Sequence, residues 1–114
     1  MLDEITNLQS RLNDPSLLAT KGYLAGDWVD GEAGATFEVL NPARGDVVAN
    51  VADFSRAQTA EAIAKAETAQ KAWAARTGKD RANILRRWYD LMMANADDLA
   101  IILTAEQGKP LAEA

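Results

Sequence analysis

The chain has 114 residues, of which 48% are hydrophobic and 25% are charged. That composition is typical of a single globular domain and excludes fibrous, collagen-like and disordered classes. Cysteine and histidine are both absent, which excludes disulfide scaffolds, thiolate zinc sites, thiol nucleophiles and imidazole acid–base catalysis within this chain. The net charge is −5 and the basic residues are scattered, so nucleic acid is not an expected partner.

The N-terminus has the features of neither a secretory signal nor a transit peptide, because Asp3 and Glu4 precede any apolar run. The longest fully apolar stretch covers residues 99–103, whereas a membrane-spanning helix needs about 20 residues. We therefore expect a cytoplasmic protein without a membrane partner.

Changes in amino-acid composition along the chain predict an N-terminal arm (1–21), a region of short strands with a hairpin (22–55) and a helical region (56–114). In the arm, a loose apolar pattern is consistent with a short helix lying on another element. In the strand region, Gly26 predicts the turn of a hairpin. Residues 36–40 alternate in polarity as a half-buried strand does, and residues 47–51 form a further β-rich run. Together these pieces predict a short β-meander.

Three helices are predicted from polar capping residues followed by apolar side chains at helical spacing. The expected caps and their partners three positions later are Ser55 with Gln58, Thr77 with Asp80, and Asn95 with Asp98. The third helix should stop at Gly108. The second helix has an apolar face formed by Ile84, Leu85, Trp88, Leu91 and Met92.

Pro110 and the helix-forming residues after it predict the start of a fourth helix, and the sequence ends one turn later. An isolated turn is unstable because it gains one hydrogen bond for three ordered residues. We therefore expect truncation within a longer polypeptide. The alternative is a complete small protein with a frayed tail.

The carboxylates give few candidates for chemistry. Asp97 and Asp98 fall in the first turn of the third helix, where negative charge complements the helix dipole, so we expect them to be structural. Glu106 shares a face with Leu99, Ile102 and Leu103. It either points toward the apolar side, where a carboxylate needs a partner, a proton or a cation, or lies in solvent at the last turn.

Three stretches of the chain carry a family resemblance: TFEVLNPARGDVV, ILRRWYDLMMANADDLA and TAEQGKPLAEA. Through them the chain resembles the N-terminal part of the aldehyde dehydrogenase superfamily, and within it the NAD(P)-dependent succinate-semialdehyde dehydrogenases. The resemblance implies an α/β fold in which this chain supplies a short β-meander and three to four helices, residues 56–114, flanking a Rossmann-like cofactor domain.

The resemblance also implies an activity for the intact protein. That activity is oxidation of a short semialdehyde, such as succinate semialdehyde to succinate. The cofactor would be NAD or NADP, and the intact protein would be a homo-oligomer. In the family a cysteine thiolate attacks the aldehyde. Since this chain lacks cysteine, we expect no catalytic or cofactor-binding residue in it and no activity by itself.

A structural monovalent cation is the one site that the resemblance places in this chain. Its ligands would be the carboxylate of Glu106 and the backbone carbonyls of Val39 and Leu40, since oxygen ligands suit a hard cation. A second hypothesis from another class is a free-standing, non-catalytic α+β interaction or scaffold module. Coding sequence beyond Ala114 would distinguish the two.

Overall fold

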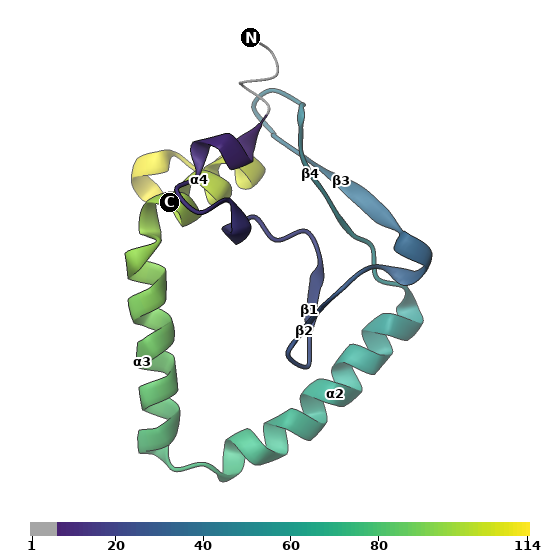
Figure 1. Ribbon diagram of the computed structural model, residues 1–114, viewed down its shortest axis with the longest axis vertical. Coiled ribbons are helices and arrows are strands. Elements are labelled where there is room, and N and C mark those ends of the chain that lie inside the picture. The colour runs from purple at the N-terminus through teal and green to yellow at the C-terminus, as the bar shows by residue number, and fades with distance from the viewer. Residues whose placement is uncertain (1–6) are drawn as a thin grey trace. The chain divides into compact units, whose positions relative to one another are not determined.

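The computed structural model describes residues 7–114 and is drawn in Figure 1. The first six residues of the predicted arm lie outside the described part. The chain forms two compact units. Among the described residues, one unit combines 7–20, 36–51 and 95–114, and the other combines 21–35 and 52–94. Each unit is therefore assembled from segments that are distant in the sequence.

In the second unit, β1 (Gly22–Leu24) and β2 (Asp27–Val29) form the predicted antiparallel hairpin. Its two turn residues, Ala25 and Gly26, have φ angles of 51° and 90°. Two successive positive φ angles define the tight turn whose twist matches that of paired strands. Tyr23 faces Trp28 across the strands, with ring centroids 5.1 Å apart in an edge-to-face arrangement.

Helix α2 (Arg56–Ala75) begins at the predicted capping box. The Ser55 hydroxyl accepts a hydrogen bond from the Gln58 N–H at 3.1 Å, and Gln58 Oε1 accepts one from the Ser55 N–H at 3.1 Å. Helix α3 (Gly78–Ala94) begins with the Thr77 hydroxyl accepting from the Asp80 N–H at 3.1 Å. Both predicted helix starts are thus confirmed.

The Gln58 side chain also ties α2 to the loop before it. Its Oε1 accepts from the Glu32 N–H at 2.8 Å, and its Nε2 donates to the Asp30 carbonyl at 3.1 Å. The loop includes the 3₁₀ turn η3 (Glu32–Gly34). At its start, Gly31 packs against backbone atoms of Ala35 and Asp53.

In the first unit, β3 (Thr36–Leu40) pairs with β4 (Val47–Ala52). The connecting turn is closed by the Asn41 N–H donating to the Asp46 carbonyl at 2.8 Å. The described strands therefore form two separate two-stranded sheets, rather than the single meander that the sequence predicts. Between β2 and β3 the chain instead forms η3, in which Ala33 and Gly34 have positive φ angles and the Ala35 N–H donates to the Glu32 carbonyl at 3.1 Å.

Helix α4 (Ala96–Gln107) ends at Gly108, whose φ of 83° confirms the predicted stop. A last 3₁₀ turn, η4 (Leu111–Glu113), follows Pro110. The N-terminal turns η1 (Leu8–Arg11) and η2 (Pro15–Leu17) form the described part of the arm. Figure 1 shows η1, in purple, against the yellow-green α4.

The core of the first unit is small. Its buried apolar residues are Leu8, Leu12 and Ala105. Helices α2 and α3 contain no buried residue within the described chain, and Trp88 on the apolar face of α3 is 62% exposed. The predicted apolar faces therefore exist but are uncovered. Among residues 7–114, no helix is long and apolar enough to cross a membrane.

Candidate functional site

The described residues hold no cluster of three aspartate, glutamate, histidine or cysteine side chains that could bind a metal ion. The whole sequence also lacks cysteine and histidine. Three features remain as candidates: the carboxylates of α4, the end of β3, and an apolar groove beside α2.

Glu106 lies at the last turn of α4 and is exposed. The buried residue of that turn is its neighbour, Ala105. Of the two alternatives for Glu106, the structure therefore favours the one in which the carboxylate lies in solvent. An exposed carboxylate needs no internal partner, but it is free to bind a cation together with nearby carbonyl oxygens.

The carbonyls predicted to accompany Glu106 belong to the end of β3, where Val39 is half-buried and Leu40 is 47% exposed. The structure brings this strand end close to the end of α4. A Cβ atom placed on Gly108 would lie 3.0 Å from Cγ of Pro42. Since Gly108 is two residues after Glu106 and Pro42 is two residues after Leu40, the three predicted ligands occupy neighbouring segments of one unit.

Asp98 is more buried than the sequence predicts. It lies in the first turn of α4 as predicted, but its side chain is only 3% exposed. Its two oxygens accept hydrogen bonds from the N–H groups of Asn13 at 2.9 Å and Asp14 at 2.8 Å. The capping pattern revealed its place in the helix, but no local signal indicates a partner 84 or 85 residues away.

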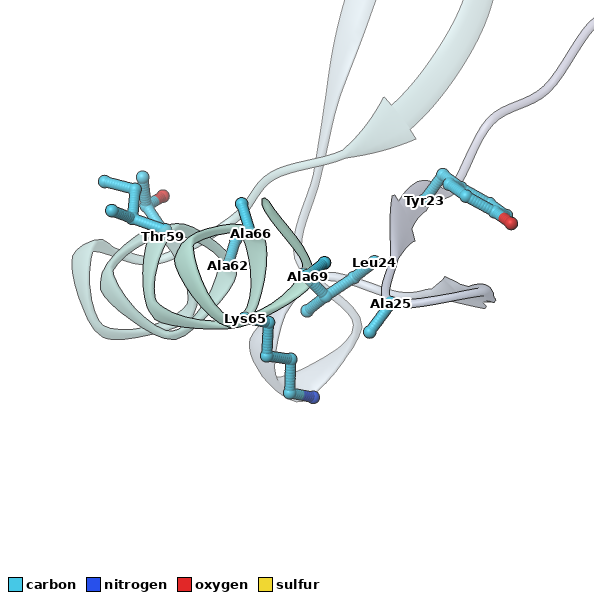
Figure 2. A pocket seen from close by; sticks show the side chains of 9 residues that line it. Tyr23, Leu24, Ala25, Thr59, Ala62, Lys65, Ala66 and Ala69 are labelled. Atoms are coloured by element: carbon cyan, nitrogen blue, oxygen red, sulfur yellow. The ribbon is translucent and has the colours of Figure 1, made fainter. Parts of the chain in front are cut away.

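An apolar groove of about 420 Å³ lies between the β1–β2 turn and α2, within the second unit. Figure 2 shows Leu24 and Ala25 on one side and the alanines of α2 on the other. Lys65 lies at the edge, and its ammonium group is 3.1 Å from a carboxylate oxygen of Glu61. The lining is mostly apolar, and its polar side chains are Tyr23, Thr59 and Lys65.

The geometry of these three features does not by itself identify a protein family, but comparison with known proteins does. Residues 28–114 match the aldehyde dehydrogenase family. The chain belongs to that family. This confirms the resemblance that its three sequence stretches indicate.

Individual members of the family agree with this assignment. The chain is 50% identical over 104 residues to a glutarate-semialdehyde dehydrogenase of Pseudomonas aeruginosa, covering 91% of this chain and 22% of that protein. It is 46% identical to the NADP-dependent succinate-semialdehyde dehydrogenase of Escherichia coli, covering 91% and 22%. A solved succinate-semialdehyde dehydrogenase from Burkholderia pseudomallei is 52% identical, with a TM-score of 0.84 over 90% of this chain and 21% of that one.

The chain therefore spans about a fifth of the length of the relatives it matches. It has the fold of the corresponding part of the aldehyde dehydrogenases, with short antiparallel strands and three α-helices among its described residues. The relatives have about four-fifths of their polypeptide outside the matched region, and the faces of α2 and α3 are uncovered in the described chain.

Proposed function

We propose that this chain is the N-terminal part of an NAD(P)-dependent semialdehyde dehydrogenase, which oxidises a short aldehyde carrying a distal carboxylate to the corresponding acid. The observation that carries the proposal is the 46–50% identity to succinate- and glutarate-semialdehyde dehydrogenases over nearly the whole chain. The semialdehyde substrate, the nicotinamide cofactor and a homo-oligomeric assembly all belong to the intact protein.

The part that these residues play is structural. When bound, the nicotinamide accepts the hydride that the aldehyde loses on oxidation. No cysteine is available in this sequence to attack the aldehyde. Residues 56–114 instead present long apolar helix faces, of which α3 has the most extensive. We propose that these faces support the cofactor-binding domain of the intact enzyme.

An activity measurement on the full-length protein tests the proposal. Succinate and glutarate semialdehyde are each supplied with NAD or NADP, and reduced cofactor is followed by absorbance. We expect turnover of at least one semialdehyde, and none with residues 1–114 alone. Oxidation of uncharged aldehydes only would contradict the substrate class. Absence of cofactor reduction with every aldehyde would contradict the enzyme proposal and support a non-catalytic scaffold.

We further propose a structural monovalent cation held by the Glu106 carboxylate and the carbonyls of Val39 and Leu40. The close packing of Gly108 on Pro42 supports it, because that contact keeps the end of α4 beside the end of β3. The donors are all oxygen, which suits sodium or potassium. The exposed position of Glu106 leaves its carboxylate accessible to such an ion.

Replacing Glu106 with alanine should remove a dependence of thermal stability on the cation. A ligand that binds only the folded state raises the melting temperature. In the full-length protein we expect potassium or sodium chloride to raise it by about 2–4 °C over tetramethylammonium chloride at equal ionic strength. The E106A variant should lose this difference, whereas E113A, which removes another exposed carboxylate, should keep it. Equal melting of the unmodified protein in all three salts would rule out the cation.

A further inference from the structure

Asp98 stands out because, of the charged side chains that the structure describes, it alone is buried. It is the third residue of α4, and the N–H groups it binds belong to Asn13 and Asp14 in the arm. Each carboxylate oxygen has its own donor, at 2.9 Å for Oδ1 and 2.8 Å for Oδ2. The geometry is therefore a two-point attachment of the arm to the helix.

The attachment depends on the negative charge. A buried carboxylate is costly unless its charge is compensated. Here two charge-assisted hydrogen bonds and the positive end of the α4 dipole provide that compensation. An amide in place of the carboxylate would offer one oxygen to two donors and would turn its NH₂ group toward the other N–H.

The rest of the attachment is apolar and short. Leu8 and Leu12 are buried, whereas Arg11 between them is exposed. On α4, Asp98 and Ala105 are the buried residues, and their spacing of seven places them on one face of the helix. Turn η1, which contains Leu8, contacts α4, and the two N–H groups bind Asp98, so residues 8–14 meet α4 over a small area.

We propose that residues 8–14 form a detachable strap, and that the charge on Asp98 holds it closed on α4. Opening the strap breaks both hydrogen bonds together, exposes Leu8 and Leu12, and frees the Asp98 and Ala105 face of α4. Among the described residues of the arm, further hydrogen bonds are local, such as the Asp14 carboxylate accepting from the Ser16 N–H at 3.1 Å, and local bonds can survive opening.

Limited trypsin digestion of the full-length protein tests the strap, because the Arg11–Leu12 bond lies inside it. A protease needs a locally open chain, so cleavage at low protease concentration follows the population of the open form. We expect D98N to raise the cleavage rate at Arg11 at least tenfold. The matched control is D97N, which neutralises the exposed carboxylate next to it and should change that rate less than twofold.

Two further measurements separate an open strap from an unfolded protein. Cleavage after Lys21 and Arg44 should stay unchanged in D98N, because both lie outside the strap. Hydrogen exchange at the Asn13 and Asp14 amides should accelerate as much as cleavage does, and D98E, which restores the charge, should recover part of the protection. Equal acceleration at all tryptic sites would make Asp98 a general stability residue and overturn the proposal. An unchanged rate at Arg11 would overturn it as well.

Discussion

Replacing Gly31 with alanine should lower the free energy of unfolding of the full-length protein by about 3 kcal/mol. A Cβ atom at this position would collide with the Ala35 carbonyl oxygen and lie 2.6 Å from that of Asp53. These are backbone atoms, and they cannot withdraw easily because the Asp53 N–H donates to the Ala35 carbonyl at 2.9 Å. Relief of the collision requires the loop before α2 to move as a whole.

The measurement is urea unfolding followed by circular dichroism, and G78A is the matched control. Gly78 is the first residue of α3, and a Cβ atom there would meet nothing within 4 Å. Alanine at that position should be neutral, or should stabilise by up to about 1 kcal/mol through its helix propensity. Equal stability of G31A and the unmodified protein would show that the loop adopts another path.

Removing the Gln58 side chain should cost about 2–3 kcal/mol, an unusually large effect for a polar residue near the surface. The Q58A substitution deletes three hydrogen bonds, one within the capping box and two to the loop at Asp30 and Glu32. A typical hydrogen bond contributes about 1 kcal/mol, and each loop group left without a partner must be solvated again.

Gln70 provides the control, because it is an exposed glutamine on the same helix. The Q70A substitution should change stability by less than about 0.5 kcal/mol. Thermal and urea unfolding of both variants check the difference. A loss below about 1 kcal/mol for Q58A would indicate that water replaces the bonds to Asp30 and Glu32, so that the capping box alone matters.

Local chemistry made most of the secondary structure predictable. Ser55 with Gln58, Thr77 with Asp80, and Gly108 mark helix ends in the sequence, and the structure places those ends where they indicate. The strand bounds at residues 36–40 and the hairpin turn at Gly26 follow in the same way from alternation and from the conformational freedom of glycine.

Interactions between distant segments could not be predicted in this way. From the sequence, Asp98 cannot be told apart from an ordinary carboxylate in the first turn of a helix. Its hydrogen-bond donors are the backbone N–H groups of residues 13 and 14, and backbone groups leave no pattern in a sequence. The division of the strands into two sheets has no local sequence signal either, and the positive φ angle of Ala33 between β2 and β3 is unexpected for an alanine. Helical spacing singles out Glu106, whereas its grouping with the carbonyls of Val39 and Leu40 rests on the family resemblance alone.

The bonds from the arm to Asp98 also affect the order in which the chain can fold during translation. Residue 13 leaves the ribosome 85 positions ahead of its acceptor, which at 5–20 residues per second corresponds to a delay of roughly 4–17 seconds. Residues 36–51 of the same unit must wait in the same way for α4. The second unit does not wait for α4, because residues 21–35 and 52–94 all precede that helix in the chain. The nascent polypeptide therefore holds Leu8 and Leu12 in water for seconds, an interval in which a chaperone can bind them.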